Sequence, residues 1–446
     1  MKAAVIGAGW AGLAAASTLR DLGASVTVFE AGRTPGGRAR RVVHPEFGDG
    51  LDNGQHILLG AYTQTLALMR RLGRNPNALL MRRPLRLASL DGAFRLSAAR
   101  LPAPWHAALA LLTARGLGFS DKLAALRLMT ALRRDGWQVP ADWTVGQLLA
   151  HHAQPAAMVR QVWEPLCLAA LNTPPALASA ALLVRVLKDS LAGGLRDSDI
   201  LLPCVDLSAL WPDAAARQVT MRYGNTVRQL DPSDRWVDVN GERFDAAVLA
   251  VPPLVAARLL GGALRETGSQ ALLKALQAFD YMPIATLNLR LARPWPLPEP
   301  MMMLREDAAR GHAGQWLFDR SRLTGADQRA ELAVVISAAA GLAEADRGAI
   351  IANLIEQVRE QAARHAGLPP MPAVELAELF IEKRATFSAV PQRARPLNHT
   401  PWRTLALAGD WTDTGYPGVL EGAVRSGLQA ARVLQAGASG GPTSHV

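Results

Sequence analysis

The sequence is poor in cysteine, aromatic residues and charge. Its 446 residues include only two cysteines, Cys167 and Cys204, which excludes a disulfide framework and a cysteine-rich metal site. Aromatic residues make up 5% and charged residues 19%, whereas 50% are hydrophobic. So much apolar material excludes intrinsic disorder for most of the chain and suffices for a large core. The length predicts two or three domains, and we expect no metal.

Lysine is the scarce basic residue. It occurs at five positions, so arginine supplies nearly all of the positive charge behind a formal net charge of +10. Two interpretations stay open: a genome composition that favours arginine, or a basic face that contacts an anionic membrane. No arginine run alternates with aromatic residues that would stack on bases, so we expect no nucleic-acid partner.

Long hydrophobic runs are also absent. The longest uncharged stretch, residues 165–184, contains Asn172 and Pro174-Pro175, which excludes a transmembrane helix. Glycines interrupt the apolar stretch that follows Met1-Lys2, so this stretch fits a cofactor motif better than a signal peptide. We expect a cytoplasmic protein that lies on the inner face of the cell membrane.

The start of the chain predicts a strand–helix–strand unit, with a strand at Lys2–Ile6, a helix at Gly12–Leu22 and a strand at Ser25–Phe29. The next patterns predict a helix at 58–72 and a mostly helical segment at 84–203, in which Ser120-Asp121 opens one helix and Thr144 another. A β-rich segment follows at 219–251 and ends in a buried strand. The rest predicts strands at 286–291, 333–338 and 405–408 and helices at 348–365 and 419–434. The fold class is therefore α/β.

A glycine-rich motif follows the first strand. It reads Gly7-Ala8-Gly9-Trp10-Ala11-Gly12, and the acidic residue Glu30, followed by Ala31, ends the next strand. Gly7 permits a tight turn, Gly9 lets a pyrophosphate approach the helix N-terminus, and Gly12 packs the helix against the sheet. Glu30 is placed to accept hydrogen bonds from a ribose. The pattern predicts a bound dinucleotide without separating FAD from NAD.

Two further segments favour FAD. Gly36-Gly37-Arg38 offers a second close backbone approach and a guanidinium aimed at phosphate. Gly409-Asp410 ends a late buried strand, where the carboxylate can hold ribityl hydroxyls. The next segment, Gly418-Val419-Leu420, opens the last helix, whose N–H groups can stabilise negative charge on a flavin.

Taken together, these motifs resemble the flavin amine oxidase and phytoene desaturase superfamily along nearly the whole chain. The resemblance implies a discontinuous Rossmann-type FAD domain at 1–83, 205–262 and 395–436, of the glutathione-reductase-like (GR2) type. It also implies an α+β substrate domain with a helical subdomain at 84–204 and 263–394, followed by a disordered tail at 437–446. By the same resemblance Val227 contacts adenine, and Asn53-Gly54-Gln55-His56 lies beside the isoalloxazine.

Within this superfamily the sequence is most similar to the hydroxysqualene dehydroxylases of bacterial squalene and hopanoid synthesis. The phrases that carry this similarity lie at 51–56, 172–175, 205–208, 382–387 and 408–417. The similarity implies reductive removal of the allylic hydroxyl of hydroxysqualene, a long-chain isoprenoid, and partners among the other squalene-synthesis enzymes. The hydroxyl needs an acid to leave as water. The catalytic candidates are His56, Asp52 and Tyr416, and Asp413 and Glu421 are weaker ones.

Three alternatives remain open. A carotenoid desaturase would move hydride from substrate to flavin, and residues alone do not fix that direction. A flavin amine oxidase is disfavoured by Val419, because the amine oxidases carry an aromatic residue there. A non-catalytic prenyl-lipid carrier is disfavoured by the complete set of FAD residues. For an isoprenoid substrate, residues 84–203 would form the wall of an apolar tunnel, with residues 101–117 or 123–132 at its mouth, flanked by arginines.

Overall fold

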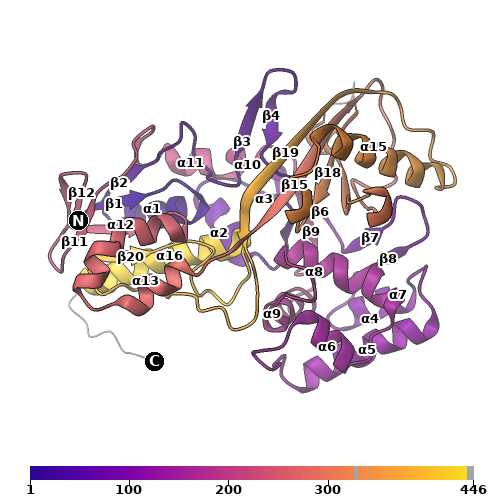
Figure 1. The fold of residues 1–446 in the computed structure, drawn as a ribbon, viewed down its shortest axis with the longest axis horizontal. Helices are drawn as coiled ribbons and strands as arrows, with labels where there is room; N and C mark the ends of the chain where they lie inside the picture. Colours follow the sequence, from indigo (N-terminus) through magenta and orange to yellow (C-terminus); the bar gives the residue numbers. More distant parts are fainter. Residues whose placement is uncertain (326–329, 343, 439–446) are drawn as a thin grey trace.

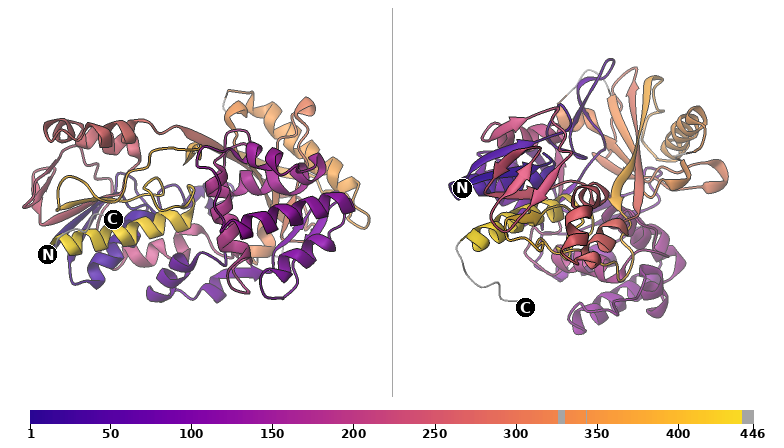
Figure 2. Two further views of the ribbon diagram at one scale, coloured as in Figure 1. Left: turned by 90° about the horizontal axis from the view of Figure 1, so that it is seen from below. Right: turned by 60° about the vertical axis from the view of Figure 1, so that its left-hand side comes forward.

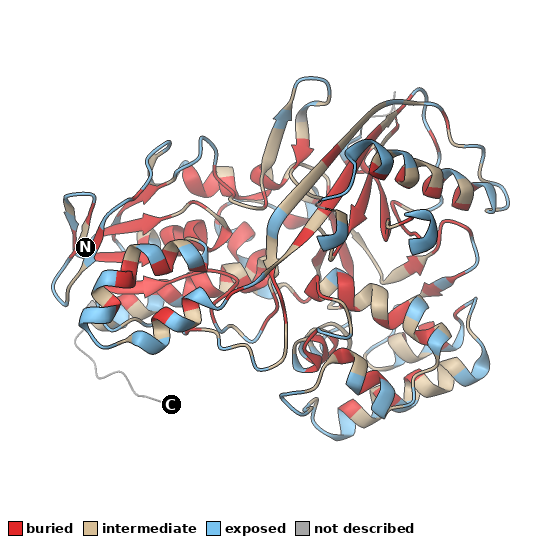
Figure 3. Ribbon diagram, in the orientation of Figure 1, coloured by how far each residue is buried: buried red, intermediate tan, exposed pale blue. Residues whose placement is uncertain are grey.

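A computed structural model describes residues 1–325, 330–342 and 344–438. A parallel sheet lies toward one end of the molecule and an antiparallel sheet toward the other, with a layer of helices beside the second sheet (Figure 1). Two views from other directions show the same arrangement, with the layer of helices around α5 at the end remote from the N-terminus (Figure 2). Buried residues concentrate in both sheets and in the helix faces turned toward them (Figure 3).

The parallel sheet combines strands from three distant parts of the chain. Its order is β10-β2-β1-β14-β20, and every neighbouring pair is parallel. The strands are β1 (Lys2–Ile6), β2 (Ser25–Phe29), β10 (Thr220–Arg222), β14 (Ala246–Leu249) and β20 (Leu405–Leu407). Such nearly continuous apolar runs are typical of strands covered on both faces. This confirms the predicted α/β class and both of the first two strands.

Helices α1 (Trp10–Asp21) and α16 (Leu420–Ala438) pack closely together against this sheet. Helix α16 extends to Ala438, which corrects the expected tail at its first two residues; residues 439–446 lie outside the described part. The elements around this sheet are β3 (Arg41–His44), β4 (Gly48–Asp52), α2 (Thr63–Arg71), α3 (Pro76–Leu79), α10 (Leu207–Leu210), α11 (Pro212–Ala216), β11 (Leu230–Pro232), β12 (Val237–Val239), β13 (Glu242–Phe244), α12 (Pro253–Glu266) and α13 (Gln270–Gln277).

The antiparallel sheet has the order β16-β17-β18-β15-β19. Its two longest strands, β15 and β19, pair with each other and reach back toward the parallel sheet (Figure 1). The elements of this part are β15 (Tyr281–Leu291), β16 (Met301–Met303), η2 (Ala308–Arg310), β17 (Trp316–Asp319), α14 (Arg320–Thr324), β18 (Ala330–Ile336), η3 (Ala340–Leu342), α15 (Arg347–Ala363) and β19 (Val374–Phe387).

The helical layer comes from the segment between β8 and β9. It contains α4 (Trp105–Leu112), α5 (Phe119–Arg134), α6 (Val145–His151), α7 (Ala156–Met158), a π-helical turn η1 (Val159–Trp163), α8 (Glu164–Leu171) and α9 (Ala180–Leu191). Thr144 caps α6 as predicted, because its hydroxyl accepts the N–H of Gln147. The residue that caps α5 is Gly118, whose N–H is bound by Asp121, so the predicted cap at Ser120-Asp121 was two residues late.

One predicted segment is confirmed and another was wrong in part. The segment 84–203 is mostly helical, as predicted; its strands are the hairpin β7 (Arg86–Ala88) and β8 (Arg95–Ser97) and the final strand β9 (Ile200–Pro203). The predicted helix at 58–72 begins only at Thr63, because β5 (Leu58–Leu59) pairs with β9, as does β6 (Leu80–Arg83). Among the described residues, no helix combines the length and apolar character needed to cross a membrane, and no cluster of side chains could hold a metal ion.

Candidate cofactor and substrate site

A cavity of about 680 Å³ lies at the carboxyl ends of β1, β2 and β14 and continues between the antiparallel sheet and helices α8 and α9. Parallel α/β sheets bind ligands at this edge, outside the carboxyl ends of their strands. One half of the cavity is lined mainly by loops of the parallel sheet, and we call it the cofactor half. The other is lined by apolar side chains, and we call it the apolar half.

The glycine loop forms the floor of the cofactor half. Gly7 has φ +102°, and a Cβ there would lie 2.4 Å from the carbonyl oxygen of Ala250. A Cβ at Gly12 would lie 1.9 Å from the carbonyl oxygen of Gly7, so glycine is required at both positions. Gly9 is the N-cap of α1, and among the described residues no side chain caps this helix. Its first N–H groups therefore stay available to a phosphate.

Glu30 holds this loop in place. One of its carboxylate oxygens accepts the N–H of Ala8 and the other accepts the N–H of Gly32, both at 2.7 Å. The side chain lines the cavity together with Ala31, and each carboxylate oxygen has a further lone pair for a ribose hydroxyl. Val227 lines the same cavity from the segment after β10.

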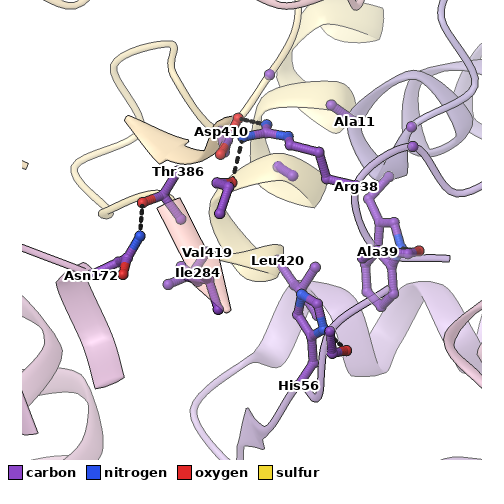
Figure 4. Close-up of a pocket in the computed structure, with 18 of the residues that line it drawn as sticks. Ala11, Arg38, Ala39, His56, Asn172, Ile284, Thr386, Asp410, Val419 and Leu420 are labelled. Atoms are coloured by element: carbon purple, nitrogen blue, oxygen red, sulfur yellow. Dashed lines mark hydrogen bonds and ion pairs between the residues drawn. The ribbon is translucent and has the colours of Figure 1, made fainter. Parts of the chain in front are cut away.

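An ion pair joins the first and last segments of the cofactor half. Arg38 donates to Asp410 at 2.6 Å and to the carbonyl oxygen of Ala385 at 2.8 Å. Figure 4 shows the Arg38 and Asp410 side chains pointing toward each other from different segments. Burial alone would lower the pKa of Arg38, but the Asp410 carboxylate raises it above its ordinary value. The guanidinium is therefore a fixed positive charge beside the glycine loops.

His56 lies deep in the same cavity, at the border of the two halves (Figure 4). Its Nδ1 lies 2.8 Å from the carbonyl oxygen of Gly54, so Nδ1 must carry the hydrogen. Burial lowers the pKa of His56, which keeps the ring neutral at pH 7. In that tautomer Nε2 has no proton to give and acts as an acceptor.

The apolar half has few polar side chains. Its walls come mainly from α8, α9 and strands of the antiparallel sheet, and include Leu166, Leu183, Leu187, Ile284, Trp316, Phe318 and Val335. Asn172, at φ +47°, donates to Thr386 and to the carbonyl oxygen of Met282, both at 3.0 Å, and so fixes the end of α8 against β15 and β19 (Figure 4).

The hydroxyl of Tyr416 donates to the carboxylate of Asp189, and both residues line the cavity. Arg185 lies one helical turn before Asp189 on α9 and pairs with it at 3.1 Å. The guanidinium groups of Arg185 and Arg425 stand over the Tyr416 ring, 5.0 Å and 4.7 Å from its centre. Burial, followed by the bond to Asp189, raises the pKa of Tyr416. Its hydroxyl therefore stays protonated across the neutral range.

Comparison with known proteins gives this geometry its context. The model of the family described as flavin containing amine oxidoreductase matches residues 10–435. The chain belongs to this family. A hydroxysqualene dehydroxylase from Rhodopseudomonas palustris is 32% identical over 97% of this chain and 98% of its own length. A probable zeta-carotene desaturase from Synechococcus elongatus matches at 26% identity over only 38% of the chain. The fold is that of the cyclohexylamine oxidase from Brevibacterium oxydans, with a TM-score of 0.67 at 19% identity over 97% of this chain and 98% of that one.

The protein is thus a flavoenzyme, and the cofactor half fits FAD. A Cβ at Gly9 would point into open space and meet only the Cα of Gly37 at 4.0 Å, so a phosphate has room to approach there, and Arg38 supplies a positive charge nearby. All but two of the residues predicted to bind the cofactor line the cavity: Gly7, Gly9, Trp10, Ala11, Glu30, Ala31, Gly36, Gly37, Arg38, Asn53, Gly54, Gln55, His56, Val227, Gly409, Asp410, Gly418, Val419 and Leu420. The exceptions, Ala8 and Gly12, shape the loop from behind.

Only some of the candidate catalytic acids line the cavity. His56 and Tyr416 line the cavity, whereas Asp52 is buried outside its lining and accepts the N–H of Leu207 at 2.8 Å. Glu421 accepts from Gln64 and Thr65 and pairs with Arg425, so its carboxylate is fully engaged. Asp413 is exposed. The sequence interpretation missed Asp189 and Asn172 as cavity residues; the Arg185–Asp189 spacing on an apolar helix was the available signal for the first.

Proposed function

We propose that this protein removes the allylic hydroxyl of hydroxysqualene and puts hydrogen in its place, which yields squalene. The observation that carries the proposal is the full-length similarity to a hydroxysqualene dehydroxylase, in a chain whose cofactor half opens directly into an apolar half. A C30 isoprenoid needs such an apolar enclosure beside the cofactor. Val419, which lines the cavity where the amine oxidases carry an aromatic residue, supports a hydrocarbon over an amine.

The reaction requires a hydride at carbon and a proton at oxygen. Bound in the cofactor half, reduced FAD would supply the hydride and would be oxidised by that transfer, and the hydroxyl would take up the proton and leave as water. The chain's part is to hold the alcohol near the cofactor, exclude water and provide the proton. The leucine-rich walls of α8 and α9 provide the first two.

For the proton we propose Tyr416. Its hydroxyl lines the cavity and carries a hydrogen, whereas Nε2 of neutral His56 carries none. In this structure the Asp189 carboxylate accepts that hydrogen, so the hydroxyl must turn from Asp189 to the substrate oxygen before it donates. Donation would leave a phenolate, which the guanidinium groups of Arg185 and Arg425 above the ring stabilise. His56 is then an acceptor that orients the substrate hydroxyl or the cofactor.

A single-turnover experiment tests both parts. The purified yellow protein is reduced anaerobically and mixed with hydroxysqualene, and flavin absorbance and lipid composition are followed. We expect reoxidation together with squalene. Without reoxidation of the bound flavin the proposal fails, and carotenoids and amines would then be offered to the oxidised enzyme. A protein purified without flavin would support a lipid carrier instead.

The Tyr416→Phe variant tests the proton donor. We expect reoxidation to slow by about 100-fold or more, since general acids contribute roughly that much. Flavin content and substrate affinity should stay within about twofold, because the ring and its cation contacts remain. Unchanged reoxidation would exclude Tyr416 as the acid.

For the cellular setting we propose squalene and hopanoid synthesis at the inner face of the cell membrane, beside the enzymes that produce hydroxysqualene and consume squalene. The support is chemical: substrate and product are both insoluble in water, and the chain carries a net charge of +10.

A further inference from the structure

Helices α4 and α5 expose large apolar side chains to solvent. Trp105 is 67% exposed and Phe119 is 76% exposed, although both are large aromatic side chains. With them we define the α4–α5 patch as the exposed residues Leu101, Trp105, Leu109, Leu112 and Phe119. Clustered exposed apolar residues on a soluble surface are typical of an interaction site.

The geometry of the two helices makes the patch continuous. Trp105, Leu109 and Leu112 are spaced by four and three residues, so they share one face of α4. The ammonium group of Lys122 on α5 donates to the carbonyl oxygen of Leu112 at 2.9 Å, which holds the start of α5, including Phe119, against the end of α4. The two helices lie at the edge of the molecule away from the parallel sheet (Figures 1 and 2).

The same segment concentrates positive charge. Residues 95–135 contain seven Arg or Lys residues and two Asp residues, so these 41 residues carry half of the formal net charge of +10. Both acids are already engaged, Asp121 with the N–H of Gly118 and Asp135 with Arg134. Among the described residues, no ion pair is formed by Arg100, Arg115, Arg127 or Arg133, all of them exposed. Arg133 stands on the same face of α5 as Phe119 and Lys122.

The opposite faces of these helices pack into the core behind the cavity. Among the described residues, none of α4 or α5 lines the cavity itself, so residues 101–117 and 123–132 do not form the predicted tunnel mouth. Leu111 of α4 and Leu128 and Leu132 of α5 join one buried cluster with Leu183 and Leu187, which line the apolar half. The patch therefore sits on the outside of the same helical layer that encloses the proposed substrate.

We propose that the α4–α5 patch docks on an anionic phospholipid bilayer, with its apolar side chains among the acyl chains and its basic side chains at the headgroups. Large aromatic and leucine side chains surrounded by arginines match the boundary between headgroups and acyl chains, where tryptophan is enriched. The charge favours a lipid surface over a second copy of this chain, which would bring two basic surfaces together. The proposal rests on the proposed function for its source of substrate, but the docking itself does not depend on it.

The test measures binding of the FAD-loaded protein to vesicles by co-sedimentation. Phosphatidylcholine vesicles with and without phosphatidylglycerol are compared for the native chain, for Trp105→Ala/Phe119→Ala and for Arg115→Gln/Arg127→Gln/Arg133→Gln. We expect binding only with phosphatidylglycerol, and a loss of at least about tenfold in each variant. Matched controls are Trp236→Ala, an exposed tryptophan remote from the patch, and Arg70→Gln/Arg217→Gln/Arg235→Gln, which removes the same charge elsewhere. Both controls should bind as the native chain does.

Equal binding by the patch variants and the controls would overturn the proposal. So would sedimentation-velocity profiles in which the native chain self-associates and Trp105→Ala/Phe119→Ala does not, since the patch would then bind a second copy. Single-turnover measurements distinguish a failure of the membrane docking from a failure of the proposed dehydroxylation. The patch variants should keep single-turnover reoxidation with detergent-solubilised hydroxysqualene and lose it with vesicle-embedded hydroxysqualene. Failure of the native chain with solubilised substrate would count against the dehydroxylation, whereas the vesicle binding data would still decide the docking.

Discussion

Asp410 balances the charge of Arg38, and with it connects the last segment of the chain to the first. Its side chain is 8% exposed and that of Arg38 is 38% exposed, so the pair is only partly screened by solvent. In Asp410→Ala the guanidinium loses this partner and the loops on both sides of the cofactor lose their link. We expect a stability loss of about 2 kcal/mol and largely colourless protein, measured by urea unfolding and by the ratio of flavin to protein absorbance. Asp410→Asn, which keeps an acceptor for Arg38, should retain more flavin. A fully yellow Asp410→Ala protein would contradict the role of this residue.

Asp52 offers a test of stability against pH. Burial raises the pKa of its carboxyl to about 7, against an ordinary value near 4. Between these two values the folded protein keeps a proton that the unfolded chain has lost, so Asp52 lowers stability as pH rises from about 4 to 7. Asn at position 52 has no proton to lose, and its amide oxygen can still accept the N–H of Leu207. Asp52→Asn should therefore gain on the order of 3 kcal/mol relative to the native chain between pH 5 and pH 8. Urea unfolding at both pH values measures this, and an equal difference at both would exclude a buried proton.

At the scale of elements, α1 and α16 pack so closely that they need glycine. A Cβ at Gly427 would lie 2.1 Å from the carbonyl oxygen of Ala11 and 2.9 Å from the Cβ of Ala14. Gly427→Ala should therefore cost about 2 kcal/mol, because α16 must move away from α1. Gly262 in α12 is the matched control, since a Cβ there meets no atom within 4 Å. Gly262→Ala should gain about 0.7 kcal/mol from helix propensity. Thermal unfolding compares the two, and effects of the same sign would contradict this account.

The elements also show where sequence reasoning succeeds and where it fails. Strands β1 and β2 follow from their own residues. Lys2–Ile6 is a short apolar run that ends at a glycine, and Ser25–Phe29 alternates between polar and apolar residues. The start of the predicted helix at 58–72 failed because a loop from elsewhere packs there: a Cβ at Gly60 would lie 1.8 Å from the carbonyl oxygen of Arg196. Strand β19 was missed because its residues are mostly half-buried and several are charged, so no alternating pattern marks it. Its pairing with β15 decides its conformation.

Across the whole molecule, one half of the cavity could be predicted from the sequence and the other could not. The cofactor half could be predicted because a phosphate cradle imposes glycine at fixed positions in one short segment. Gly7 has a positive φ, and at Gly12 a Cβ would collide with the carbonyl oxygen of Gly7. The apolar half combines residues such as Leu187, Asn172 and Val335 from three separate elements. Only the tertiary fold brings these together, and each alone is an ordinary core residue.

Because the cavity contacts both sheets and the helical layer, FAD should stabilise the molecule as a unit. Its lining runs from Gly7 in the first loop to Ala423 in the last helix. Removing FAD should lower the unfolding midpoint by several degrees, and free FAD at about 100 times its Kd should restore roughly 2.7 kcal/mol. FMN lacks the adenosine half, for which Glu30 and Val227 are the proposed contacts, so it should restore much less. Calorimetry of the FAD-free protein with each ligand measures this. Equal stabilisation by FMN and FAD would mean that the glycine loop and Glu30 do not hold an adenosine. A midpoint that does not change with FAD would mean that the folded protein does not bind FAD in preference to the unfolded chain.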